Sequence, residues 1–193
     1  MSTACSTGPG IGLRSPTGCG GVRHRSPELP FTSLLDDARV VRDVVASRKA
    51  LGRRVVLVGH GYGGTVISEG GADADALVFL AATVPAHGET TTAAAEVSGS
   101  PLRDQPMIRV GESTIALAGP RAAVVGAFYN LAPPDGVDFF WAGLRAVPLS
   151  LFDEPTGASP AWQTVPSTYI VCEADNALPV DCQRRWVTRR TTA

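Results

Sequence analysis

Long apolar runs are the first thing that this sequence lacks. No stretch of the chain approaches the ~20 consecutive apolar residues that a membrane span needs. The N-terminal segment has no continuous apolar core of the kind found in a secretory signal. We therefore expect neither membrane insertion nor export, and the expected compartment is the cytoplasm.

A charge excess of either sign is also missing. The formal net charge is −1 and the isoelectric point is near 6.3, so no global field attracts nucleic acid or an anionic membrane. The last expected helix carries four arginines: Arg184, Arg185, Arg189 and Arg190. Nucleic-acid binding needs a broader basic surface than one helix, and we interpret these arginines as a solvated face.

Cysteine motifs are absent as well. The four cysteines are Cys5, Cys19, Cys172 and Cys182. None forms a Cys-x-x-Cys pair and no histidine stands at zinc-finger spacing, so the sequence predicts neither a metal nor a cofactor. Free thiols in a reducing cytoplasm are the expected state.

What the chain does have is the composition of a globular domain. Its 193 residues are 44% hydrophobic and 18% charged, which is enough apolar material for one sizeable core. Residues 1–30 are rich in Gly, Ser, Pro and Thr without apolar periodicity, and we expect an irregular or disordered segment there. Gly8, Gly10 and Gly12 have no strand before them and no helix after them, which argues against a phosphate-binding loop.

A helix is predicted from Ser33 to Leu51, where apolar residues recur with a period near 3.6. Ser33 is a suitable N-cap and Gly52 a natural stop. The following run, residues 53–58, is apolar on consecutive positions, as in a strand buried on both faces of a parallel sheet. A second helix begins at Thr65.

Two more buried strands are predicted at residues 76–81 and 167–172, and a last helix at 179–190. Strand, helix and strand in this order form a right-handed βαβ unit. The segment 85–160 is mixed, with helical patches near 114–130 and 135–146, and we interpret it as a lid inserted over a sheet edge. The expected fold class is α/β, with a mostly parallel sheet, flanking helices and a helical cap.

The turn after the first strand is the most specific motif of the chain. It reads Gly59-His60-Gly61-Tyr62-Gly63-Gly64. Strand, glycine-rich turn and helix form the context of a nucleophile elbow, in which a strained central residue of positive φ sits between two small residues. We expect Gly59 and Gly63 to be the flanking residues that must lack bulk. Gly61 stands where such a turn carries a serine, and it has no side chain to form a covalent intermediate.

These residues and several further segments resemble the α/β-hydrolase superfamily, most closely its small esterase-like branch near plant methylesterases and hydroxynitrile lyases. The segments that carry the resemblance are residues 27–34, 55–68, 80–88, 128–130, 160–162 and 169–179. By this match Asp175 is the triad acid and the backbone N–H of Tyr62 is an oxyanion donor. The resemblance divides the chain into a core of residues 31–84 and 161–193, and a cap of residues 85–160.

Three departures from the family pattern follow from the resemblance. Gly61 replaces the nucleophile, no histidine follows Asp175, and the family's strands before the elbow have no counterpart in residues 1–26. The chain is therefore expected to lack parts of the fold at both ends, and with them one half of the oxyanion hole. His60 and His87 remain as candidate substrate-binding residues.

The resemblance leaves three functions open. The favoured one is a hydrolase-like protein without triad chemistry, a relic or a module that binds a small apolar ester or ketone. The second is an active hydrolase of small esters that uses a non-standard base. The third is an interaction module, because the absent strands would leave apolar sheet edges open to a second copy or another chain.

Overall fold

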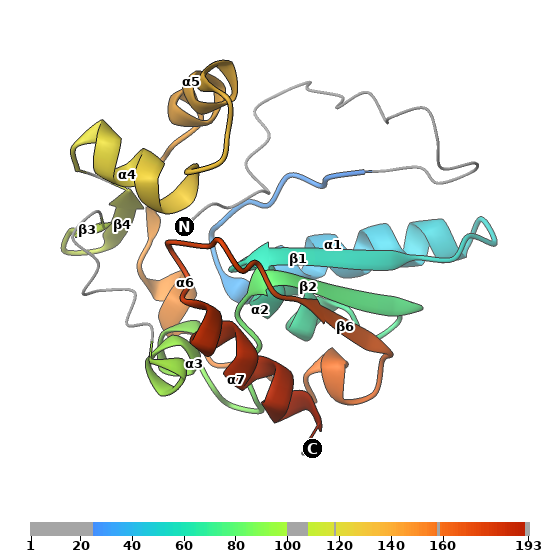
Figure 1. The fold of residues 1–193 in the computed structure, drawn as a ribbon. Helices are drawn as coiled ribbons and strands as arrows, with labels where there is room; N and C mark the ends of the chain where they lie inside the picture. Colours follow the sequence, from blue (N-terminus) through green and yellow to red (C-terminus); the bar gives the residue numbers. More distant parts are fainter. Residues whose placement is uncertain (1–24, 100–107, 118, 158, 192–193) are drawn as a thin grey trace.

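The computed structural model describes residues 25–99, 108–117, 119–157 and 159–191. Its central sheet is parallel and three-stranded, with the order β1-β2-β6. The strands are β1 (Val56–Gly61), β2 (Ala76–Ala82) and β6 (Ser167–Ile170). The three strands predicted from the sequence are thus neighbours in one sheet, and their carboxyl ends meet at one edge, as Figure 1 shows.

Helices cover one face of this sheet. They are α1 (Leu34–Lys49), α2 (Gly63–Gly70), the short 3-10 helix η2 (Ala161–Gln163) and α7 (Val180–Thr191). Leu77 and Phe79 of β2 are fully buried in one cluster with Ile67 of α2 and Trp186 of α7. This cluster is the core that positions the strand ends.

Helix α1 begins and ends as its sequence predicts. Ser33 is extended, and its Oγ accepts a hydrogen bond from the backbone N–H of Asp36 at 3.0 Å, which satisfies one of the helix's unpaired N-terminal donors. Its apolar side chains pack into a second cluster together with Tyr62 and Phe152. The predicted helix and its N-cap are confirmed.

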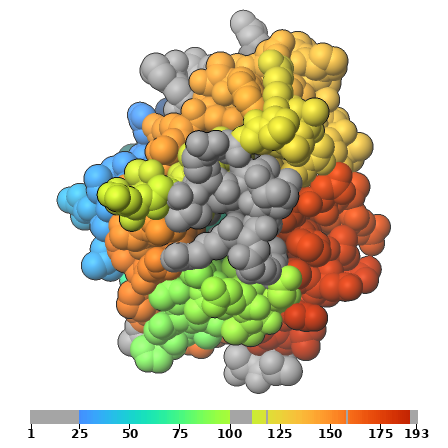
Figure 2. Space-filling model, turned by 90° about the vertical axis from the view of Figure 1, so that its left-hand side faces the viewer, coloured from blue at the N-terminus to red at the C-terminus, as the bar shows by residue number. Residues whose placement is uncertain are grey.

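The region between β2 and β6 is more mixed than predicted. Besides η2, the described residues of this region form four helices and a small antiparallel sheet of order β3-β4-β5. The helices are α3 (Thr91–Ser98), α4 (Arg121–Phe128), α5 (Pro134–Ala142) and α6 (Ser150–Asp153), and the strands are β3 (Ile108–Val110), β4 (Thr114–Leu117) and β5 (Val147–Pro148). In Figure 2 the yellow segment of this region lies above the green one, and orange atoms lie both above and beside the green.

The prediction of a helix from residue 114 is wrong at its start. Thr114–Leu117 forms strand β4, which pairs with both of its neighbours, and Ile115 is buried. Pro120 precedes the helix that does form, α4. A proline fixes its own φ and disfavours a helical residue before it, so one helix cannot run through this point.

The arginines of α7 are not a uniformly solvated face. Arg189 forms an ion pair with Glu89, and both side chains are largely buried. Arg185 donates to the carbonyl of Ser98 at 3.1 Å, while Arg184 is exposed beside Asp181. These contacts fasten α7 to the segment around α3, so two of the four arginines are structural.

The other face of the sheet is open in the part of the chain that the structure describes. Val56 and Val58 of β1 are 57% and 62% exposed, and Ile170 of β6 is 47% exposed. The register Val58↔Val78 and Leu80↔Ile170 places these apolar side chains on the same face. No helix among the described residues has the length and apolar character of a membrane span.

Candidate functional site

The turn from β1 into α2 has the geometry of a nucleophile elbow. Strand β1 ends at Gly61, whose φ is +56°, and α2 begins two residues later at Gly63. A residue with a side chain is strained at this φ, whereas glycine is not. The predicted positive φ of the central residue is confirmed.

Close backbone contacts explain two of the neighbouring glycines. A Cβ on Gly59 would lie 2.5 Å from the carbonyl oxygen of Gly63, and a Cβ on Gly64 would lie 2.2 Å from that of Thr83. A Cβ on Gly63 would meet no atom within 4 Å. The expectation that Gly63 must lack bulk is therefore wrong, and Gly64 carries that requirement because the end of β2 crosses α2 there.

Hydroxyl groups hold the elbow against the end of β2. The backbone N–H and the Oγ1 of Thr83 both donate to the carbonyl of Gly61, at 3.1 and 3.2 Å. Oγ1 of Thr65 lies 2.9 Å from Oγ1 of Thr83 and 2.9 Å from Oγ1 of Thr91. All three threonines are buried. Sequence analysis missed this network, although Thr83 directly follows a predicted strand.

A buried carboxylate on α1 holds the Tyr62 side chain of the elbow. Asp37 of α1 is 0% exposed and accepts hydrogen bonds from the backbone N–H of Phe31 at 2.9 Å and from the Tyr62 hydroxyl at 3.1 Å. Burial raises the pKa of Asp37, and these two bonds oppose the rise. The side chain of Tyr62 is thus anchored in the core, so any contact with an oxyanion would come from its backbone N–H.

A cavity of about 450 Å³ lies above the elbow, at the carboxyl ends of the strands. Ligands of open α/β sheets bind at this edge. The elbow contributes His60, Gly61 and Tyr62 to the lining, and β2 contributes Leu80 and Ala81. Leu80 pairs with His60, but the register then shifts so that Ala82 pairs with Gly61, and the intervening Ala81 takes a φ of +40°.

The loop after β6 forms one wall of the cavity, and Asp175 is fixed within it. Its Oδ1 accepts from the backbone N–H groups of Ala177 and Leu178, at 2.8 and 2.9 Å, and its Oδ2 accepts from the Gln183 amide at 3.3 Å. Gln183 is fully buried and also bonds the backbone N–H and carbonyl of Cys172. No local sequence pattern indicates the role of Gln183, because that role depends on how α7 packs against the loop after β6.

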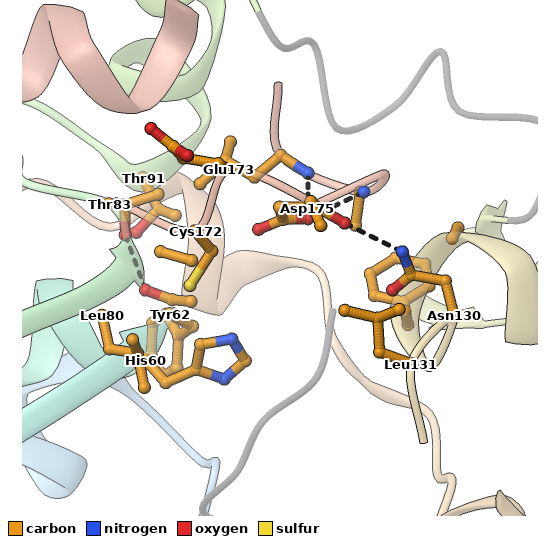
Figure 3. A pocket seen from close by; sticks show the side chains of 17 residues that line it. His60, Tyr62, Leu80, Thr83, Thr91, Asn130, Leu131, Cys172, Glu173 and Asp175 are labelled. Atoms are coloured by element: carbon orange, nitrogen blue, oxygen red, sulfur yellow. Dashed lines mark hydrogen bonds between the residues drawn. The ribbon is translucent and has the colours of Figure 1, made fainter. Parts of the chain in front are cut away.

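The opposite wall comes from the end of α4 and the residues after it. Phe128, Asn130 and Leu131 line the cavity there. The Asn130 amide donates to the carbonyl of Ala174 at 2.8 Å, as Figure 3 shows. The two walls, which are far apart in the sequence, are thereby joined across the cavity.

Four of the five predicted site residues meet in this cavity: His60, Gly61, Tyr62 and Asp175. The fifth does not, because His87 is exposed outside the lining with its Nδ1 3.1 Å from the carbonyl of Gly157. Cys172 also lines the cavity, as Figure 3 shows. Burial and the charge of Asp175 raise the pKa of the Cys172 thiol, so it is not an activated nucleophile.

The site combines an elbow without a reactive side chain, a fixed carboxylate and a largely apolar cavity. At Gly61 there is no atom that can attack a carbonyl carbon. Among the residues that the structure describes, no group of three His, Cys, Asp or Glu side chains could hold a metal ion. This arrangement can enclose a small molecule.

Known proteins are similar to this chain in sequence and in fold. The model of the alpha/beta hydrolase family matches residues 10–193. A curated relative, the alpha/beta hydrolase nvfD of Aspergillus novofumigatus, is 27% identical over 168 residues, which are 81% of this chain and 65% of the relative. The chain thus spans about two thirds of that relative's length.

Solved structures with the same fold include three proteins under 25% identical to this chain. The pyrethroid hydrolase PytH aligns with a TM-score of 0.67 at 21% identity, over 86% of this chain and 72% of that one. Polyneuridine aldehyde esterase aligns with a TM-score of 0.66 at 17% identity, over 82% of this chain and 68% of that one. Tomato methylketone synthase I in complex with 2-tridecanone aligns with a TM-score of 0.61 at 20% identity, over 83% of this chain and 66% of that one. With the elbow, the sheet order and the family match together, the chain belongs to the alpha/beta hydrolase family.

Proposed function

We propose that this chain is a non-catalytic member of the family that binds a small apolar molecule in the cavity above the elbow. The observation that carries the proposal is Gly61. It occupies the strained centre of an intact elbow, with φ at +56°, and supplies no nucleophile. Asp175 alone cannot perform triad chemistry, because the acid of a triad acts only by orienting and stabilising a histidine.

The cavity itself supports binding. Its volume of about 450 Å³ falls within the ~300–1,000 Å³ of typical small-molecule sites. The walls are held by hydrogen bonds between Asn130 and Ala174 and between Asn176 and Gly126, which favours a preformed site. One fold neighbour, tomato methylketone synthase I, was crystallised with the apolar ketone 2-tridecanone.

Loss of catalysis is tested with short-chain nitrophenyl esters. We expect the wild-type chain to hydrolyse them at the buffer rate. Gly61→Ser adds the hydroxyl, and we expect it to remain below the roughly 10³–10⁴-fold residual acceleration of a protease that has lost triad members but kept its oxyanion hole. Gly61→Ala is the matched control for strain at this φ. Wild-type turnover that Asp175→Ala abolishes would contradict the proposal and favour an active esterase with another base.

Binding is tested by calorimetry and thermal unfolding with 2-alkanones of increasing length. A ligand present at 100 times its Kd stabilises the folded state by about 2.7 kcal/mol, so we expect a clear rise in Tm. Ala127→Phe, at a buried position of α4 that lines the cavity, should abolish the rise. Ala122→Phe on the exposed side of the same helix should keep it.

The open sheet face supports a second candidate, pairing with a second copy of the chain. Val58 and Ile170 expose apolar surface on one face, and they belong to β1 and β6, which are the edge strands of the described sheet. Both features favour association. We expect sizing with light scattering to show a dimer at high concentration, and Val58→Lys to shift the population toward the monomer. Arg54→Lys, at an exposed position just before β1, is the control. A wild-type chain that is monomeric at every concentration excludes this candidate.

A further inference from the structure

The formally charged side chains that line the cavity are all acidic. Glu173 and Asp175, both on the loop after β6, line the cavity, as Figure 3 shows. Among the lining residues that the structure describes there is no lysine or arginine. A bound molecule therefore lies in the field of two carboxylates, and these lining residues supply no fixed cation to balance them.

The two carboxylates differ in their freedom. Asp175 is half-buried and receives three hydrogen bonds, from the backbone N–H groups of Ala177 and Leu178 and from the side chain of Gln183. These donors are formally neutral, so they orient the carboxylate but leave its charge in place. Glu173 is exposed, and in Figure 3 its carboxylate points away from Asp175, so this side chain must turn to face a ligand in the cavity.

One feature of the cavity attracts negative charge instead. Helix α2 starts at the elbow, and the N-terminus of a helix carries roughly half a positive charge. That partial charge is smaller than the two negative charges of Glu173 and Asp175. It suits a neutral carbonyl or hydroxyl oxygen above Tyr62, while the net field across the cavity disfavours a free carboxylate.

From this balance we infer that the cavity selects molecules with an apolar body and a cationic amine group, and discriminates against carboxylates. The inference rests on the proposed ligand-binding function and adds the charge class of the ligand. The apolar wall formed by Leu80, Phe128 and Leu131 takes the body. The ammonium group lies toward Glu173 and Asp175.

The test compares three molecules of equal length: hexylamine, hexan-1-ol and hexanoate, each titrated into the full chain at pH 7 and low salt. We expect hexylamine to bind roughly three- to tenfold more tightly than hexan-1-ol, because exposed and half-buried charge pairs contribute modestly. Hexanoate should bind most weakly. The advantage of the amine should shrink as salt is raised.

Two variants identify the charges that are responsible. Glu173→Gln should remove most of the advantage in affinity that hexylamine has over hexan-1-ol. Asp175→Asn keeps the oxygen that accepts from the backbone N–H groups of Ala177 and Leu178, and it should also reduce the advantage of the amine. Glu96→Gln, an exposed position of α3 outside the described lining, should change nothing.

The possible failures are distinguishable. If hexan-1-ol binds and Ala127→Phe blocks it, but hexylamine is no tighter or hexanoate is tightest, the charge selection is overturned and the proposed binding function stands. If none of the three binds to wild type, the proposed function itself fails. An amine preference that persists in Glu173→Gln and in Asp175→Asn also overturns the inference.

Discussion

Gly64→Ala is expected to prevent stable folding, whereas Gly63→Ala, one position earlier, should leave the protein folded or slightly stabilise it. The new Cβ at position 64 would lie 2.2 Å from the backbone oxygen of Thr83 and 2.8 Å from the Cβ of Ala82. Overpacking usually costs about 1–3 kcal/mol, and the cost is expected to be higher here because a backbone atom rather than a flexible side chain must move. That loss is a large part of the roughly 5–15 kcal/mol stability of a domain.

Gly63→Ala is expected to change the stability in the opposite direction, for a reason that lies in its own surroundings. A Cβ at Gly63 meets nothing within 4 Å, and Gly63 is the first residue of α2. Alanine restricts the unfolded chain more than glycine does, which is worth up to about 1 kcal/mol in a helix. Urea unfolding followed by circular dichroism measures both variants. Equal stabilities of the two variants would contradict the crossing of α2 by the end of β2.

Asp37→Ala is expected to lower the free energy of unfolding by about 2–5 kcal/mol, because two buried donors lose their acceptor. These donors are the backbone N–H of Phe31 and the hydroxyl of Tyr62. The loss should also loosen the elbow, since Tyr62 joins β1 to α2. Asp43→Ala, an exposed aspartate on the same helix, should stay within about 0.5 kcal/mol of wild type. Denaturant unfolding at pH 7 compares the two.

The pH dependence of Asp37 gives an independent check. Burial raises the pKa of Asp37 in the folded protein above its ordinary value of 3.8, so the folded state holds this proton more tightly than the unfolded chain does. The free energy of unfolding therefore falls as pH rises from about 3.8 through the raised pKa. Asp37→Asn cannot ionise and should lack this fall. The lowered pKa values of Asp36 and Asp75 make the stability rise with pH instead. Both groups are present in wild type and in Asp37→Asn, so the difference between the two pH profiles reports Asp37.

The sequence predicted the elements around the elbow well, because their signals are local. The N-cap at Ser33, the three strands and the positive φ of Gly61 each follow from a few adjacent residues, and the structure has them all. The predicted burial of the strands on both faces is wrong for β1 and β6, because in the described residues no helix covers the second face of the sheet. The antiparallel strand at Thr114–Leu117 was missed. Its four residues are too few to distinguish a strand from the helical patch predicted there, and the strand forms by pairing with Ile108–Val110 and Val147–Pro148.

The site was predictable only in part for the same reason. The meeting of Gly61, Tyr62 and Asp175 follows from parallel strands that end at one edge, and the structure places all three in one cavity. His87 was expected near that cavity because it follows β2, yet the backbone carries it to the exposed carbonyl of Gly157. Contacts such as Asn130 with Ala174 join segments 44 residues apart, and no local pattern encodes them.

By itself, the sequence determined the chemistry that is missing: a glycine at the centre of an elbow cannot be a nucleophile in any packing. It also determined the strand–turn–helix order, because glycine spacing and apolar runs act over a few residues. Only the tertiary structure decided which glycines are indispensable, how Asp37 and Tyr62 support the turn, and that the cavity is lined by two carboxylates. Those properties depend on distances between atoms of separate elements, which are set when the sheet and its helices pack together.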